Sequence, residues 1–221
     1  MDEAAHLAAD EEAGRKLFAG PCEFIWAASK ADALPPLSVP EIAFAGRSNV
    51  GKSSLLNALT NRKALARISH TPGRTQQLNF FALGAAPPHE RLRLIDMPGY
   101  GYAAVSKQKV ADWTQLMRDY LRGRPSLARV FVLVDGRHGL KDVDGEMFAL
   151  LDAAAMSYQV VLTKRDEVSA VDADACVEAT LTGLRQHAAA HPDVIFTSAR
   201  TGGGVPELRA EVARLLRERG A

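Results

Sequence analysis

Short apolar runs recur along this chain, each bounded by polar or turn-forming residues. Six of them have the length and composition of buried strands. They lie at 24–28, 42–45, 78–83, 91–95, 160–162 and 194–196, and the fourth of them includes Arg91 and Arg93. The run at 24–28 is expected at the edge of a sheet. The runs at 78–83 and 91–95 are expected to pair across the loop between them.

Between these runs, apolar residues recur at the three- and four-residue spacing of helices that bury one face. Two such stripes are Val110, Trp113, Met117, Tyr120 and Leu121, and Val205, Leu208, Val212, Leu215 and Leu216. We interpret both stripes as core faces. The alternation of strands with helices predicts an α/β fold, with a mostly parallel sheet of six strands or so and helices on both faces.

Composition narrows the possible partners. The chain has 221 residues, of which 47% are hydrophobic, and its formal net charge is +1. Nucleic-acid binding must therefore depend on a local basic patch, and no DNA partner is expected. No apolar run approaches the roughly 18 residues of a membrane helix, and the acidic start is unlike a signal peptide. We therefore expect a cytoplasmic protein with no membrane partner.

The strongest motif follows the run at 42–45. Residues Gly46-Arg47-Ser48-Asn49-Val50-Gly51-Lys52-Ser53 have the spacing G-x-x-x-x-G-K-[ST], typical of a phosphate-binding loop between a strand and a helix. Backbone N–H groups in such a loop turn toward phosphate oxygens, Lys52 can reach the β and γ phosphates, and the Ser53 hydroxyl can bind Mg²⁺. The alternative is a chance glycine-rich turn, which the helical pattern after Ser53 disfavours.

A second phosphate-sensing loop, which we call the second switch, is predicted after the run at 91–95. It reads Asp96-Met97-Pro98-Gly99. Asp96 can hold Mg²⁺ through water, and the Gly99 N–H can bond a γ-phosphate. Alone this D-x-x-G is weak, because Asp, Pro and Gly fill ordinary turns. Its position after a strand supports the functional interpretation.

Two further loops indicate guanine recognition. The run at 160–162 leads into Thr163-Lys164-Arg165-Asp166, and the run at 194–196 leads through Phe196 into Thr197-Ser198-Ala199. Asp166 can accept from both N1–H and the amine of guanine, whereas adenine offers no such donor pair. The Lys164 stem can pack along the base, and the backbone at 197–199 can contact the base oxygen. A P-loop kinase or ATPase is therefore disfavoured.

With these loops in order, the chain resembles the translation-factor-related GTPases and, among them, the YihA/EngB family of ribosome-biogenesis GTP-binding proteins. The segments that carry the resemblance are Gly46–Ser54, Thr71–Gln76, Asp96–Tyr102 and Thr163–Asp166. It implies a P-loop GTPase fold, with residues 21–221 as a single GTP-binding domain after a flexible acidic arm at 1–20. It also implies a monomer in the cytoplasm that assists assembly of the large ribosomal subunit, contacts its rRNA, and is needed for normal cell division and growth.

The resemblance assigns the first switch as well. It implies that Thr75 joins Ser53 on Mg²⁺ when the γ-phosphate is present, although on chemistry alone Thr71 would serve equally. The neighbouring residues expected at the nucleotide are Gly73, Arg74, Gln76 and Gln77.

The expected catalytic groups are Lys52, Asn49, Thr75 and Gly99. Tyr100 stands where Ras-like enzymes have a water-orienting glutamine, so intrinsic GTP hydrolysis should be slow. Gln76 and Gln77 are weaker candidates for that role. Asn49 matches a position that holds K⁺ in related GTPases without this glutamine, where the ion acts as a fixed positive charge. The alternative, with equal weight, is that Asn49 stabilises its own loop and does not bind an ion.

Two features have competing interpretations. Lys107, Lys109, Arg118, Arg122 and Arg124 form either a solvated helix face or an rRNA contact beside the second switch. The segment 142–146 resembles a calcium loop but lacks ligands, so a helix start is favoured. A GTP-dependent signalling switch with protein partners only is the alternative to an assembly factor.

Overall fold

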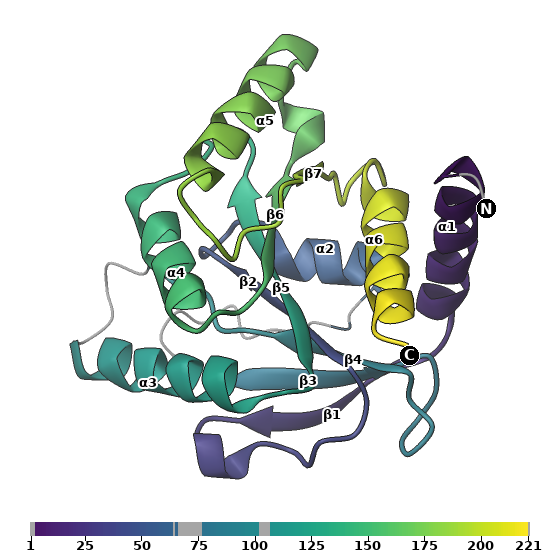
Figure 1. Ribbon diagram of the computed structural model, residues 1–221, viewed down its shortest axis with the longest axis vertical. Helices are drawn as coiled ribbons and strands as arrows, with labels where there is room; N and C mark the ends of the chain where they lie inside the picture. Colours follow the sequence, from purple (N-terminus) through teal and green to yellow (C-terminus); the bar gives the residue numbers. More distant parts are fainter. Residues whose placement is uncertain (1–2, 64, 66–76, 102–106, 221) are drawn as a thin grey trace.

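A computed structural model describes residues 3–63, 65, 77–101 and 107–220. Within them, seven strands form one sheet in the order β1-β3-β4-β2-β5-β6-β7 (Figure 1). The strands are β1 (Cys22–Ala28), β2 (Glu41–Gly46), β3 (Leu78–Leu83), β4 (Leu92–Asp96), β5 (Leu127–Asp135), β6 (Tyr158–Thr163) and β7 (Ile195–Phe196). The β1/β3 and β3/β4 pairs are antiparallel, and the others are parallel. The expected α/β architecture is confirmed.

Six helices accompany the sheet in this part of the chain. They are α1 (Glu3–Ala19), α2 (Lys52–Leu59), α3 (Lys107–Gly123), α4 (Asp142–Ala153), α5 (Ala170–Leu184) and α6 (Val205–Glu218). The start of α4 confirms that 142–146 begins a helix. Its N-cap is Lys141, whose backbone N–H donates to Asp144 Oδ2 at 2.9 Å.

One of the seven strands, β5, is absent from the six predicted from the sequence. All nine of its residues are buried, and it pairs with β2 and β6 at the centre of the sheet. The continuous apolar run 130–134 is the signal that would have found it, since strands buried on both faces lose the two-residue alternation. The expected edge strand at 24–28 lies within β1.

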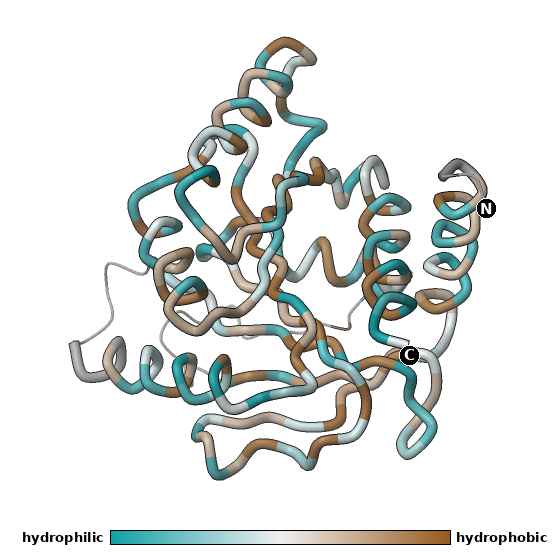
Figure 2. Tube along the Cα trace, in the orientation of Figure 1, coloured by the Kyte–Doolittle hydropathy of each residue, from teal (hydrophilic) through white to brown (hydrophobic). Residues whose placement is uncertain are grey.

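Two apolar layers cover the faces of the sheet. Along β2, Ala43 and Ala45 face one layer, with α3 and α4, while Ile42 and Phe44 face the other, with α2 and α6. Figure 2 shows the hydrophobic residues gathered along the central strands and on the inner sides of these helices. The α6 stripe is buried as expected, and so are Met117, Tyr120 and Leu121 of α3.

The N-terminal segment differs from its expectation. Residues 3–19 form α1, which lies beside α6 (Figure 1), so a loose arm does not describe them. Gly14, Leu17 and Phe18 share one helix face and are buried. A Cβ on Gly14 would lie 2.4 Å from the Arg209 carbonyl oxygen, so the two helices meet closely there. Near the C-terminal end of α6, the Arg217 guanidinium bonds the Asp10 carboxylate at 2.9 Å.

Candidate nucleotide-binding site

The loops after β2, β4, β6 and β7 all leave the carboxyl ends of parallel strands, and they therefore gather at one edge of the sheet. Each of the four motifs expected to bind nucleotide lies on one of these loops. The contacts between the loops define the candidate site.

The glycine-rich loop turns back toward the sheet through two left-handed residues. Asn49 has φ 61° and Gly51 has φ 99°, a region that glycine adopts readily and asparagine tolerates. Gly51 is the N-cap of α2, and as a glycine it has no side chain to cap the helix. A helix N-terminus without a side-chain cap, preceded by a curled loop, is suited to a phosphate group.

Lys52 and Ser53 stand in the first turn of α2. The Lys52 ammonium is ion-paired with the Asp96 carboxylate at the end of β4, and Asp96 is 2% exposed. Ser53 is half-buried beside it in sequence. A hydroxyl and one carboxylate, completed by phosphate oxygens and water, are the donor set that Mg²⁺ commonly takes from proteins. Within the described residues there is no cluster of three or more His, Cys, Asp or Glu that would hold a metal without nucleotide.

The second switch lies directly against the glycine-rich loop. The Tyr100 N–H donates to the Gly46 carbonyl, and the Ser48 N–H donates to the Tyr100 carbonyl, both at 3.3 Å. A Cβ on Gly99 would lie 3.6 Å from the Ser48 nitrogen. Gly99 is thus placed beside the loop expected to hold the phosphates, while Met97 is buried in the core.

Tyr100 turns away from this loop and into the protein. It is 7% exposed, and its hydroxyl donates to Asp144 Oδ1 at 2.9 Å. The Arg47 guanidinium lies 3.3 Å from the same oxygen. Burial raises the pKa of Asp144, although the Lys141 N–H, the Tyr100 hydroxyl and Arg47 favour its ionised form. Burial and the adjacent Asp144 also raise the pKa of Tyr100 well above its usual range, so the phenol remains a donor.

Asp166 is the centre of the expected base pocket. Its side chain is 8% exposed and accepts from two groups, Ser198 Oγ at 2.5 Å and Arg200 Nε at 2.6 Å. The Ser198 hydroxyl, followed by the Arg200 guanidinium, holds the pKa of Asp166 below its usual value. Both carboxylate oxygens already accept hydrogen bonds, in the way that the two donors of a guanine edge would require.

Lys164 joins the base loop to the phosphate loop. Its ammonium donates to the Asn49 carbonyl at 3.0 Å and to Asp135 Oδ2 at 2.8 Å. The Thr163 hydroxyl adds a 2.7 Å bond to the Val50 carbonyl. Burial disfavours ionisation of Asp135, but hydrogen bonds from Arg137 and Lys164 outweigh it and hold the Asp135 pKa below the usual range. These contacts hold the Lys164 ammonium between the glycine-rich loop and the end of β5.

Asp135, Asp144 and Arg200 are the residues here that sequence reasoning missed. Asp135 ends the apolar run of β5, which was itself overlooked. In the sequence, Asp144 indicates only a helix start, and Arg200 follows the last predicted loop directly. Of these, only Asp135 had a usable signal, a carboxylate at the carboxyl end of a buried strand.

The remaining predicted residues divide into two groups. In the base loop, Arg165 lies over the Phe196 ring at 5.4 Å, its N–H donates to the buried Thr197 carbonyl at 3.0 Å, and Ala199 is half-buried. Pro98 and Gln77 are also half-buried. The first-switch residues Thr71, Gly73, Arg74, Thr75 and Gln76 lie outside the described residues, so their roles stay predictions.

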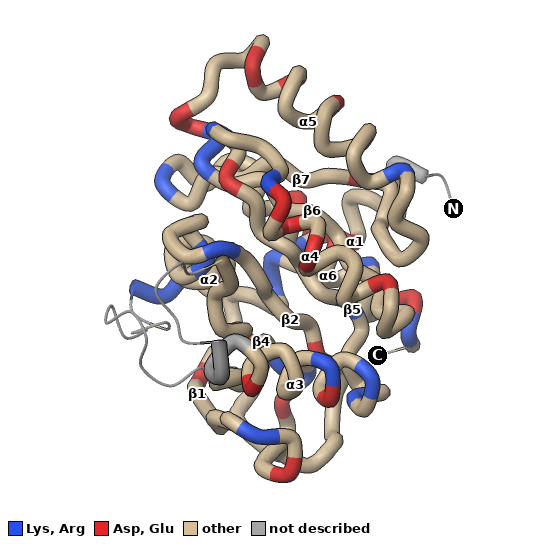
Figure 3. Tube along the Cα trace, turned by 90° about the vertical axis from the view of Figure 1, so that its left-hand side faces the viewer, with Lys and Arg blue, Asp and Glu red and all other residues tan. Residues whose placement is uncertain are grey.

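The basic cluster does not form one continuous face. Arg124 is buried and bonds the Glu41 carboxylate at 2.6 Å, so its assignment to an exposed cluster is wrong. Arg124 neutralises the buried Glu41 carboxylate, which would be costly to leave unpaired, and so links the end of α3 to β2. Arg118 and Arg122 are exposed. Figure 3 shows Lys and Arg interspersed with Asp and Glu on this side of the molecule. The side chains of Lys107 and Lys109 lie outside the described ones.

Of the helices that the structure describes, none combines the length and apolar character that crossing a bilayer demands.

Comparison with known proteins identifies the family. A family model described as 50S ribosome-binding GTPase matches residues 41–164. A probable GTP-binding protein EngB of Rhodopseudomonas palustris (strain TIE-1) is 62% identical over 208 residues, covering 94% of this chain and 95% of the relative. The protein of the same description from Nitrobacter hamburgensis is 58% identical over 207 residues, with 94% of each chain covered.

Among solved structures, a probable GTP-binding protein engB has the same fold, with a TM-score of 0.60 and 23% identity over 80% of this chain and 99% of that one. At this identity the likeness concerns the fold alone. The two close relatives and the family model carry the assignment. The chain belongs to the 50S ribosome-binding GTPases and, among them, to the EngB-type GTP-binding proteins.

Proposed function

We propose that this protein binds GTP and GDP together with Mg²⁺, hydrolyses GTP slowly, and acts in assembly of the large ribosomal subunit. The observation that carries the proposal is the meeting of four loops at one sheet edge, with Lys52 and Asp166 at its two ends. Residues 21–221 are the proposed GTP-binding domain, to which α1 is added along α6.

In this proposal the phosphates lie over Gly46–Ser53. Lys52 exchanges its bond to Asp96 for the β and γ phosphates, and Ser53 with Asp96 holds Mg²⁺, with Thr75 added in the GTP state. The metal would supply charge neutralisation on the phosphates. The base reaches Asp166, and guanine then takes the position that Arg200 occupies on that carboxylate.

Slow hydrolysis follows from the surroundings of Tyr100. A buried phenol bonded to Asp144 does not present a group to a water beside the γ-phosphate. The Asn49 side chain, in contrast, is exposed and has no hydrogen bond to any described residue. Its amide oxygen is therefore free to bind K⁺, which would supply a fixed positive charge near the phosphates.

The ribosomal role rests on the family, whose description names the 50S subunit. We propose that the GTP-bound protein associates with the large subunit, including its rRNA, as a cytoplasmic monomer, and that cell division and growth depend on this step. The test is sedimentation of the purified protein with isolated large subunits in a non-hydrolysable GTP analogue or in GDP, with small subunits as the control. Pelleting with large subunits only in the GTP analogue is expected. Equal pelleting in both nucleotides, or none, would contradict the proposal.

A signalling switch with protein partners only is the second candidate. Treating the bound complex with RNase separates the two, because a partner that is only protein stays bound.

A further inference from the structure

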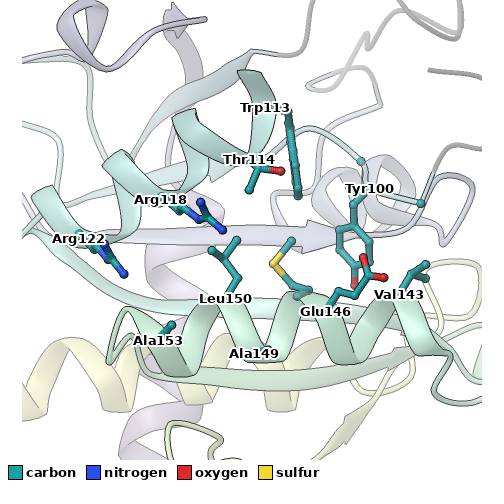
Figure 4. A pocket seen from close by; sticks show the side chains of 13 residues that line it. Tyr100, Trp113, Thr114, Arg118, Arg122, Val143, Glu146, Ala149, Leu150 and Ala153 are labelled. Atoms are coloured by element: carbon teal, nitrogen blue, oxygen red, sulfur yellow. The ribbon is translucent and has the colours of Figure 1, made fainter. Parts of the chain in front are cut away.

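A cavity of about 690 Å³ lies between α3 and α4, on the face of the sheet away from α6. We call it the α3–α4 cavity. Its walls come from Trp113, Arg118 and Arg122 of α3 and from Glu146, Met147 and Leu150 of α4. Figure 4 shows side chains of both helices projecting into the space between them. The nucleotide loops described above do not account for this cavity.

One end of the α3–α4 cavity is the second switch itself. Gly99, Tyr100 and Gly101 contribute to its lining. Because Gly99 is the residue expected to sense the γ-phosphate, a change of its position alters the cavity. Tyr100 connects the same end to α4 through its 2.9 Å bond to Asp144. An occupant of this cavity would therefore contact the segment that is expected to change position between nucleotide states.

The other end carries two unpaired cations. Arg118 and Arg122 are four residues apart on α3, so they lie on one side of the helix and repel each other. Both are exposed, and neither guanidinium makes a hydrogen bond or ion pair to another described residue. Arg124, two residues further on, is fully paired with Glu41. The pair at the cavity is thus available for an anionic partner.

We propose that the α3–α4 cavity binds a protein segment of the large ribosomal subunit, which inserts an apolar side chain between Met147 and Leu150 and sets carboxylates against Arg118 and Arg122. This inference rests on the proposed function and names the contact by which the subunit recognises the second switch. Apolar burial supplies affinity, and the two guanidiniums supply orientation and selectivity.

A protein segment suits this cavity better than RNA. Val143, Met147, Ala149, Leu150 and Ala153 give the cavity an apolar wall on α4, and the exposed Glu146 lies on the same wall. A polyanion would meet this apolar wall and carboxylate, whereas a protein segment can bury an apolar side chain there and place a cation or amide against Glu146. The rRNA contacts of the proposed function would then lie elsewhere, with the exposed Arg62 and Lys63 as the next candidates.

Two variants test the proposal by different means. Arg118→Glu/Arg122→Glu reverses the charge at the cavity, and Ala149→Trp fills it from α4 without changing charge. Matched controls are Arg185→Glu and Ala179→Trp, both at exposed positions of or next to α5. Melting temperatures verify folding. Both test variants should bind isolated large subunits at least about tenfold more weakly in the GTP analogue, while the controls bind as the unaltered protein does.

A photo-crosslinking residue in place of Ala153, which lines the cavity, identifies the occupant. Irradiation with purified large subunits should yield an adduct to a ribosomal protein that is lost when Ala149→Trp is added. An adduct to rRNA, or wild-type binding by both test variants, would overturn this inference and leave the proposed function standing. Failure of the unaltered protein to bind large subunits would overturn both.

Discussion

The Tyr100 hydroxyl donates a 2.9 Å hydrogen bond to Asp144 Oδ1, and this bond ties the second switch to the first turn of α4. Asp144 is fully buried, and its other oxygen accepts from the Lys141 N–H. Tyr100, which is expected to stand where Ras-like enzymes have a water-orienting glutamine, is therefore a structural tether. Movement of the second switch must break this bond or carry α4 with it.

Removing that hydroxyl tests the tether. Tyr100→Phe should destabilise the protein by about 1–3 kcal/mol, because a buried carboxylate loses a donor. Tyr158→Phe is a matched control in the same apolar layer, since the Tyr158 hydroxyl is buried without a hydrogen-bond partner among the described residues. It should leave stability unchanged or raise it slightly. Denaturant unfolding measures both, and equal losses would contradict the role assigned to Tyr100.

Asp166→Asn should weaken GTP binding by roughly 100-fold or more and allow xanthine nucleotides to bind. The amide can donate to the xanthine oxygen, where the carboxylate accepted from guanine. Titration calorimetry with GTP and xanthosine triphosphate measures the exchange. Unchanged GTP affinity would remove Asp166 from the base pocket.

The two proposed magnesium ligands should respond differently to nucleotide. Ser53→Ala should weaken Mg²⁺-dependent binding of GDP and GTP alike, by on the order of tenfold, since Ser53 is fixed in the first turn of α2. Thr75→Ala should weaken the GTP complex and spare GDP, because we propose that Thr75 joins the site only when the γ-phosphate is bound. Calorimetry with GDP and a GTP analogue compares them. Equal losses in the Thr75 variant would argue against its assignment.

GTP hydrolysis should be faster in potassium than in sodium at matched ionic strength, by on the order of tenfold. Sodium holds its water more tightly and suits a potassium site poorly. Asn49→Gly removes the side-chain oxygen and still permits φ 61°, so this variant should lose the difference. Phosphate release measures the rates, and identical rates in the two salts would exclude the ion site.

Replacing glycine with alanine should have opposite effects at Gly14, where α1 packs closely on α6, and at Gly145 in α4. Gly14→Ala should destabilise the protein by about 1–3 kcal/mol, because its Cβ would lie 2.4 Å from the Arg209 carbonyl oxygen. Gly145→Ala, in α4, meets no atom within 4 Å and should add about 0.5–1 kcal/mol through helix propensity. Thermal unfolding compares them. A neutral Gly14→Ala would mean that α1 is held only loosely.

The sequence by itself determined the architecture, the four loops and the family, because these depend on local signals. Apolar runs, glycine spacing and a carboxylate after a strand can be recognised along the chain, and parallel strands bring their carboxyl ends together. The apolar run of β5 is a signal of the same kind, although β5 was not among the predicted strands. The burial of α1 was harder to see, since only Gly14, Leu17 and Phe18 mark its packed face within a polar segment.

Only the tertiary structure decided which charged side chains pair and which remain available. Arg118, Arg122 and Arg124 look alike in sequence, yet Arg124 meets the buried Glu41 from a strand 83 residues away, while the other two line a cavity. Tyr100 likewise became a tether only because α4 places Asp144 beside it. Such contacts depend on the distance and burial of groups far apart in the chain, which no local pattern records.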